Sequence, residues 1–215
     1  VTPEILELAR REAIMIDAGK TGFGKAMHQD DINALIVQHG LDGHHVVRLK
    51  AGDPTVFGRL DEELAAIEAA DLSYTIVPGI TAACAAVAGI GQSLTQRGRN
   101  SSVRFITGHD TKGYADHDWK ALAEVGQVAA IYMGKKSARF IQGRLLMHGA
   151  DPLTPVTVIE NVSRPDQRVI ATTLADLELT ISNANLTGPA LTFLGLAPRA
   201  AVQAAQSHDL RLEAL

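Results

Sequence analysis

The turn Gly52-Asp53-Pro54 stands where an apolar segment gives way to a segment with helical spacing. Gly52 lets a ligand approach the backbone closely, and the carboxylate of Asp53 can accept hydrogen bonds from a hydroxyl or an ammonium group. In open α/β sheets, ligands bind at loops that follow the carboxyl ends of strands. An ordinary turn between a strand and a helix explains the same residues. The spacing by itself leaves both interpretations open.

A second loop of the same kind runs from Pro78 to Thr81, and Thr81 can cap a helix that continues through several alanines. The small side chains of this helix would let a bulky ligand lie against it. Threonine is also a common cap with no further role. A polar stretch later in the chain holds His109 and His117, but it lacks the helical histidine spacing of a metal site. We therefore expect no metal ion there.

The elements that must position these loops follow an α/β pattern, because short β-branched runs alternate with longer segments of helical period. The pattern predicts strands at Ala13–Asp17, His45–Lys50, Tyr74–Val77, Val103–Thr107, Val128–Met133, Pro155–Glu160, Arg168–Thr172 and Ala190–Leu194. It predicts helices at Pro3–Arg10, Gln29–Gln38, Leu60–Ala70, Thr81–Ala88, Trp119–Glu124, Ser137–His148 and Leu174–Ser182.

The sequence between Gly89 and Ser102 is polar and irregular, which is typical of a connection between two sheets. We place a domain boundary near Gly98, so that residues 1–98 and 99–215 form two α/β domains. The first domain is predicted to hold a mostly parallel sheet. In the second, two strands close together in sequence predict a mixed sheet with an antiparallel pair.

The composition excludes several classes of protein. With 46% hydrophobic and 20% charged residues, the chain of 215 residues is an ordinary globular protein. A net charge of −4 and 4% aromatic residues argue against a nucleic-acid-binding surface. No apolar run is long enough to span a bilayer. The single cysteine, Cys84, cannot form an internal disulfide, which favours a cytoplasmic location.

Several motifs, taken together in their order and spacing, resemble the tetrapyrrole methylase family, specifically the uroporphyrinogen-III C-methyltransferases. The resemblance covers essentially the whole chain. Its motifs are Arg48-Leu49-Lys50-Ala51-Gly52-Asp53-Pro54, Val56-Phe57-Gly58-Arg59, Val77-Pro78-Gly79-Ile80-Thr81-Ala82, Thr107-Gly108-His109 and Tyr132-Met133-Gly134.

The resemblance implies two α/β domains with the active site in the cleft between them, in a homodimer. It implies transfer of two methyl groups from S-adenosylmethionine to uroporphyrinogen III, which gives precorrin-2 and S-adenosylhomocysteine. The residues that match the family's contacts to the methyl donor are Ala51, Gly52, Asp53, Val56, Thr81, Ala82, Met133, Val162 and Ala190.

By the same resemblance, Arg59 and Glu62 are catalytic residues at the tetrapyrrole, and Lys20 transfers a proton. Arg97 and Met133 match substrate-binding positions. The chemistry is consistent with these roles, because a substrate with many carboxylates needs guanidinium partners. A pyrrole carbon that accepts a methyl group must also lose a proton.

The chain departs from the family pattern at Ala51, Leu60, Asp61 and Gln96. Family members also begin with a strand and a glycine-proline-rich loop that carries a catalytic aspartate, and this sequence starts just after that aspartate. We therefore expect the chain by itself to be inactive and the same chain extended upstream to be active.

Three rival functions stay open at this point. The first is a methyltransferase for a later cobalamin precursor, and the second is a non-catalytic binding protein derived from the family. The third is a metal-dependent hydrolase built around His109 and His117. Sirohaem, cobalamin and haem d₁ all draw on precorrin-2, so the sequence does not distinguish between these pathways.

Overall fold

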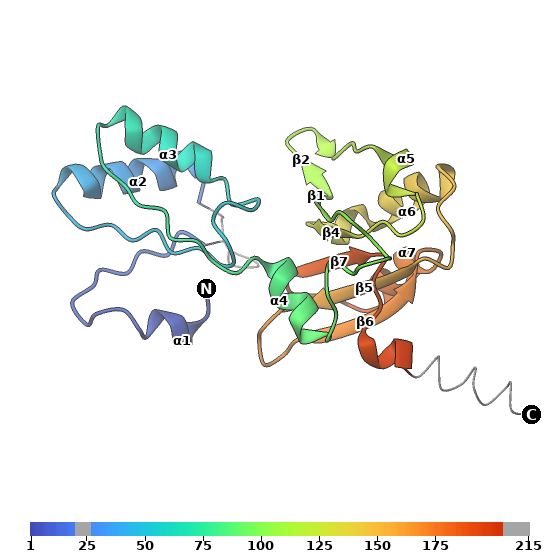
Figure 1. The fold of residues 1–215 in the computed structure, drawn as a ribbon. Helices are drawn as coiled ribbons and strands as arrows, with labels where there is room; N and C mark the ends of the chain where they lie inside the picture. Colours follow the sequence, from blue (N-terminus) through green and yellow to red (C-terminus); the bar gives the residue numbers. More distant parts are fainter. Residues whose placement is uncertain (20–26, 204–215) are drawn as a thin grey trace, which may run out of the picture. The chain divides into compact units, whose positions relative to one another are not determined.

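The computed structural model describes residues 1–19 and 27–203, and the chain divides into two units, residues 1–80 and 81–215 (Figure 1). This division falls ahead of the predicted boundary near Gly98. Helix α4 (Ala82–Gly89) explains the difference, because Ala83 and Ala86 are fully buried among side chains of the second unit. A functional domain that extends to Gly98 stays a prediction.

The described part of the first unit contains the helices α1 (Pro3–Leu6), α2 (Gln29–Leu41) and α3 (Leu60–Ala69). Helices α2 and α3 pack against each other (Figure 1). Helix α1 is shorter than the sequence predicts, and none of its residues is buried. A helix gains most of its stability by packing an apolar face. Because α1 buries no residue, no packing stabilises further turns.

The strands predicted for the first unit are not formed in its described part. The segments Ala13–Asp17, His45–Lys50 and Tyr74–Val77 have no regular secondary structure, so the predicted parallel sheet is not present among these residues. Their apolar side chains stay exposed, 71% for Val47 and 75% for Val77. Short apolar, β-branched runs favour a strand, but a ladder also needs a hydrogen-bonded neighbour that local sequence does not supply.

The second unit is built on a mixed sheet in the order β1-β4-β7-β5-β6 (Figure 1). Strands β1 and β4 are parallel, and β7 runs antiparallel to both β4 and β5. The antiparallel pair of β5 and β6 confirms the prediction of such a pair. The strands are β1 (Arg104–Thr107), β4 (Ala129–Tyr132), β5 (Pro155–Glu160), β6 (Arg168–Thr173) and β7 (Ala190–Leu194).

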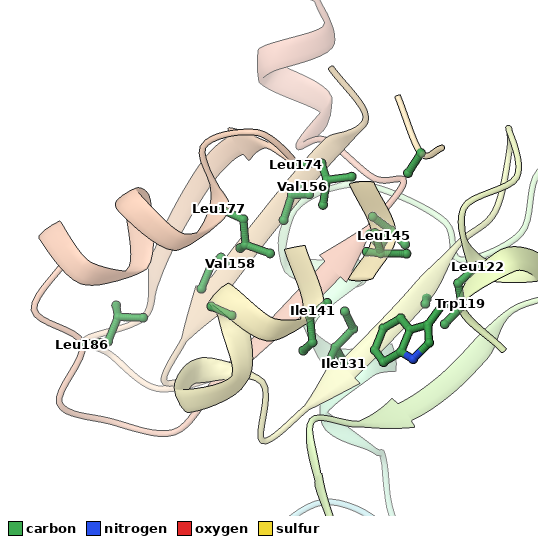
Figure 2. Close-up of a cluster of buried hydrophobic side chains, with 14 residues drawn as sticks. Trp119, Leu122, Ile131, Ile141, Leu145, Val156, Val158, Leu174, Leu177 and Leu186 are labelled. Carbon is green, nitrogen blue, oxygen red and sulfur yellow. The ribbon is translucent and has the colours of Figure 1, made fainter. Parts of the chain in front are cut away.

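Helices cover both faces of this sheet, because alternate residues of a strand point to opposite faces. In β4, Ala129 and Ile131 pack into one cluster, whereas Ala130 packs with helix α4 in another. Figure 2 shows the first cluster, in which side chains from three helices meet those of the sheet. These helices are α5 (Trp119–Leu122), α6 (Ala138–Met147), which follows the 3₁₀ turn η1 (Lys135–Ser137), and α7 (Leu177–Asn183).

A short hairpin, β2 (His109–Asp110) and β3 (Gly113–Tyr114), follows β1 and was not predicted. Two residues per strand are too few for an alternating pattern to be recognised. The α/β class of the chain is confirmed. Among the residues that the structure describes, no helix has the length and apolar character needed to cross a membrane.

Candidate functional site

Asp53 organises the first candidate loop. Its Oδ1 accepts hydrogen bonds from the N–H (2.8 Å) and the hydroxyl group of Thr55, and its Oδ2 accepts one from the N–H of Gly79 (3.2 Å). The donors on Thr55 lower the pKa of Asp53 below its ordinary value, so the side chain is a carboxylate at neutral pH. The local geometry is the Asx turn that the sequence allows, and Gly79 joins it to the second loop.

Glycines let the two loops approach each other. Gly52 has a φ of 76°, in the left-handed region that favours glycine, and its carbonyl oxygen would lie 2.1 Å from a Cβ atom on Gly79. Ala51 and Gly52 are exposed, and the N–H of Val56 donates to the carbonyl oxygen of Asp53 (3.2 Å). The predicted donor residues of the first unit therefore form one ordered and accessible turn.

Arg59 and Glu62 form a bidentate ion pair next to this turn. Arg59 donates from Nε to Oε1 of Glu62 (2.7 Å) and from a terminal nitrogen to Oε2 (2.6 Å). The hydrogen bonds between these two side chains lower the pKa of Glu62 and raise the pKa of Arg59. Arg59 lies just before α3 with a φ of 55°, and 56% of its side chain is exposed. Its remaining N–H groups are accessible to an anionic ligand.

A pocket of about 470 Å³ borders this ion pair, within the usual size range of ligand pockets. The pocket is lined by Thr55, Phe57, Gly58, Arg59, Leu60, Asp61, Glu62, Leu64 and Ile76. Two of the predicted catalytic residues thus lie at one hollow of the first unit. A second hollow of about 250 Å³ lies in the second unit, where β5 begins and β7 ends, and no predicted site residue lines it.

Glu63, which the sequence analysis missed, is the buried centre of a charge network. It accepts hydrogen bonds from Nζ of Lys50 (2.6 Å), Nε of Arg48 (3.0 Å) and Nε2 of Gln29 (3.2 Å), and its side chain is 3% exposed. Burial alone raises the pKa of Glu63, but the hydrogen bond from Lys50 and the charge of Arg48 outweigh it and lower the pKa.

This network connects α2, α3 and the segment that leads into the Gly52-Asp53 turn. One signal in the sequence points to it. Arg48 and Lys50 are two residues apart, so both can project to the same side of an extended segment. They need an acidic partner, which the first turn of α3 supplies at Glu63.

Three predicted residues of the second unit lie at one edge of its sheet. Met133 is the first residue after β4, Val162 is the second residue after β5, and Ala190 is the first residue of β7. In the observed registers Ile131 pairs with Thr192 and Glu160 pairs with Ala190, so β4 and β5 end where β7 begins. Met133 has a φ of 54° and is 51% exposed, so its side chain is accessible at this edge.

Thr81 and Ala82 join the same edge through Tyr132. The hydroxyl groups of Thr81 and Tyr132 are hydrogen-bonded to each other, and the N–H of Ala83 donates to the Tyr132 hydroxyl group (3.1 Å). Thr81 precedes α4 without capping it by its side chain, which corrects the sequence-based expectation. Tyr132 satisfies a free N–H of the helix instead, and this holds Thr81 and Ala82 beside the end of β4.

Asn161, a second residue missed from the sequence, holds a buried hydrogen-bond acceptor with no partner in the described part of the chain, its Oδ1. The amide nitrogen of Asn161 donates to Asp166 Oδ2 (2.7 Å), and a Cβ atom on Gly188 would lie 2.1 Å from Asn161 Oδ1. Asn161 has a φ of 53°. A buried acceptor without a partner is costly, so a ligand N–H or O–H group at this edge would stabilise it.

Glu160, immediately before Asn161, is buried and fully engaged. It accepts hydrogen bonds from the N–H of Gly188 (2.6 Å) and from a terminal nitrogen of Arg168 (3.0 Å). The N–H of Gly188 lowers the pKa of Glu160 despite its burial. Glu160 therefore fixes the 188–190 segment to the end of β5.

The remaining predicted residues lie elsewhere. Lys20 lies outside the described residues. Arg97 is exposed, in a turn of the second unit closed by the bridge between Gln96 and Asn100. Nε2 of His117 is hydrogen-bonded to the carbonyl oxygen of Thr107 (2.8 Å). Among the described residues, His109 and His117 belong to no group of close metal-ligating atoms.

The sequence of the chain is similar to a known protein family and to known enzymes. The sequence model of the Tetrapyrrole (Corrin/Porphyrin) Methylases matches residues 1–178. A siroheme synthase from Edwardsiella ictaluri (strain 93-146) is 42% identical over 195 residues, covering 91% of this chain and 42% of that protein. Siroheme synthase 1 from Yersinia enterocolitica is 45% identical over 195 residues, covering 91% of this chain and 41% of that protein. The chain thus spans about two fifths of the length of these relatives.

The structure of the chain is also similar to solved structures of methyltransferases. The uroporphyrin-III C-methyltransferase from Thermus thermophilus in complex with S-adenosylhomocysteine has a TM-score of 0.67 and 31% identity, covering 78% of this chain and 73% of that one. A cobalt precorrin-4 methyltransferase has a TM-score of 0.70 at 22% identity, covering 79% and 71%. The second similarity shows a shared fold alone.

Proposed function

The chain belongs to the tetrapyrrole methylase family, and on this premise we propose that it transfers methyl groups from S-adenosylmethionine to carbon atoms of uroporphyrinogen III, giving precorrin-2. Bound S-adenosylmethionine supplies a methyl group activated by a sulfonium. The relatives named siroheme synthase, at 42% and 45% identity, support a tetrapyrrole substrate. The Thermus enzyme named for uroporphyrin III, at 31% identity, supports uroporphyrinogen III in particular.

The observation that carries donor binding is the gathering of Thr81, Ala82, Met133, Val162 and Ala190 at one edge of the sheet of the second unit. The unpartnered Oδ1 of Asn161 at this edge fits a ligand that donates a hydrogen bond, and the adenosine of the donor carries such groups. In the first unit, Ala51, Gly52, Asp53 and Val56 would hold the donor. Because both oxygens of Asp53 are engaged by Thr55 and Gly79, Asp53 acts chiefly by shaping the exposed Gly52 backbone.

Arg59, Glu62, Arg97 and Lys20 are assigned to the tetrapyrrole. Arg59 would bind a substrate carboxylate with the N–H groups that Glu62 leaves accessible, and Glu62 keeps the guanidinium oriented. Arg97 and Met133 would add further contacts to the substrate. Lys20 would accept or pass on the proton that the methylated carbon must lose. The enzyme's main contribution is to orient the reacting atoms.

We propose a cytoplasmic homodimer, because a single cysteine suits a reducing compartment and the resemblance implies a dimer. A methyltransferase for a later cobalamin precursor is the second candidate. The cobalt precorrin-4 methyltransferase, at 22% identity, shares the fold, and this likeness does not favour one substrate over the other.

Calorimetric titration of the full protein with S-adenosylhomocysteine tests donor binding. We expect saturable binding with a stoichiometry of one per chain. Gly52→Val should abolish it, because a β-branched residue does not tolerate a φ of 76° and its side chain would enter the exposed turn. Gly143→Ala is the control, since its added Cβ meets nothing within 4 Å. Absence of binding to the folded wild-type protein would overturn the proposal.

A further inference from the structure

Three potential metal ligands meet at the carboxyl end of helix α2. A ring nitrogen of His39, a carboxylate oxygen of Asp42 and a ring nitrogen of His44 all lie within 4.8 Å of one another. The two imidazole rings have centroids 5.5 Å apart. No residue predicted to bind the methyl donor or the tetrapyrrole belongs to this group.

The backbone of the helix end explains why these side chains meet. The N–H of His44 donates to the carbonyl oxygen of His39 (3.1 Å), and the N–H of Gly43 donates to that of Gly40 (3.0 Å). With Gly43 at a φ of 82°, this is the glycine-capped helix end called the Schellman motif. The motif usually places two apolar side chains in contact, and here both positions are histidines.

The three side chains are available to a ligand. His39 is half-buried, and Asp42 and His44 are exposed. Within the described ranges of the chain, no hydrogen bond or ion pair engages any of the three side chains. An ion from solvent can therefore reach the three side chains. The hydrogen bonds of the helix cap already hold the backbone of these residues in place.

We propose that His39, Asp42 and His44 bind one divalent transition-metal ion, of the class of Zn²⁺ or Ni²⁺. Two imidazoles and a carboxylate are ligands that these ions accept, whereas Mg²⁺ prefers oxygen ligands. Around a tetrahedral Zn²⁺ the ligand atoms lie about 3.4 Å apart. Small rotations of the exposed side chains would bring the ligand atoms of this group to that distance. The remaining coordination positions would hold water.

A bound ion would tie the end of α2 to the His44–His45 segment that leads toward Arg48 and Lys50. A ligand that binds only the folded state raises its stability by mass action. Zinc or nickel should therefore raise the melting temperature of the protein, and the increase should saturate with the concentration of the ion.

The test is calorimetric titration of the full protein, free of any polyhistidine tag, with ZnCl₂, NiCl₂ and, for comparison, MgCl₂, together with melting curves. We expect one Zn²⁺ or Ni²⁺ per chain at this site and no binding of Mg²⁺. Loss of an outer-shell partner costs about 10–100-fold in metal affinity, so His39→Ala and His44→Ala should each weaken binding at least about tenfold. Asp42→Asn should weaken it as well.

His45→Ala is the matched control, because His45 is the next residue in the chain but not a member of the group. It should bind zinc and nickel like the wild type. Circular dichroism checks that each variant is folded, and His44 is exposed enough for its loss to leave the fold intact. Wild-type affinity in both His39→Ala and His44→Ala, or no zinc or nickel binding to the wild type, would overturn the proposal.

Discussion

Gly79 lies so close to Gly52 that a Cβ atom on Gly79 would stand 2.1 Å from the carbonyl oxygen of Gly52. The N–H of Gly79 also donates to Asp53, 26 residues earlier in the chain. Two loops that are separate in the sequence therefore behave as one structural element. Any side chain at position 79 must push them apart.

Gly79→Ala should lower the free energy of unfolding by about 1–3 kcal/mol, the usual cost of forcing extra atoms into a packed contact. It should also weaken binding of S-adenosylhomocysteine, because the Gly52 turn would shift. Urea unfolding and calorimetry measure the two effects. Gly143→Ala, in helix α6 with open space around it, is the control and should be neutral or stabilising by up to about 1 kcal/mol. Equal behaviour of the two variants would contradict the structural role of the contact.

Glu63→Gln should destabilise the protein strongly, because it leaves Lys50 and Arg48 without their buried anionic partner. Removing one member of a buried ion pair typically costs about 3–5 kcal/mol, and the partial exposure of Arg48 favours the lower end. Glu68→Gln, on the same helix and exposed, should change the free energy of unfolding by less than about 0.5 kcal/mol. Comparable urea midpoints for the two variants would show that the network is not important for stability.

Stability should fall in acid because of Glu63 and Glu160. Both have a pKa below the ordinary value of 4.5 in the folded protein. Their contribution is therefore fully present above pH 4.5 and is lost as the pH falls through the lower folded-state pKa. The free energy of unfolding of the wild type should decrease below about pH 4.5. Glu160→Gln should show a shallower decrease, and an unchanged slope would contradict this assignment.

Arg59→Ala should leave binding of S-adenosylhomocysteine nearly unchanged while reducing methyl transfer. Loss of a charged hydrogen-bond partner costs about 1.5–3 kcal/mol, or roughly ten- to a hundredfold in kcat/KM. Lys20→Met should behave in the same way if Lys20 carries the proton. Arg139→Ala, an exposed arginine on helix α6, should keep full activity. Wild-type turnover in Arg59→Ala would require a different tetrapyrrole site.

The sheet of the second unit could be predicted from the sequence because its signals are local. β5 and β7 have the predicted bounds, and both are buried on two faces as their apolar runs indicate. The predicted strand His45–Lys50 in the first unit shows the limit of such reasoning. Its apolar, β-branched run is a local property, whereas ladder formation depends on a distant segment.

The family motifs name candidate site residues, whose roles stay predictions, whereas contacts that form only on folding could not be predicted from the sequence. The motifs named Asp53 and Met133 as candidates, and the spacing of Arg48 and Lys50 indicated an acidic partner. Only the folded structure identifies that partner as Glu63. Asn161 was missed because its unpartnered Oδ1 results from packing against Gly188, 27 positions later. Such relationships exist only in the folded chain.

Methyl transfer from radiolabelled S-adenosylmethionine to uroporphyrinogen III, measured with the full-length protein, decides whether uroporphyrinogen III is the substrate. We expect incorporation of two methyl groups per tetrapyrrole, with the mass of precorrin-2, and loss of this transfer in Gly52→Val. No transfer to uroporphyrinogen III by a protein that binds the donor, together with methylation of a later cobalamin precursor, would contradict it.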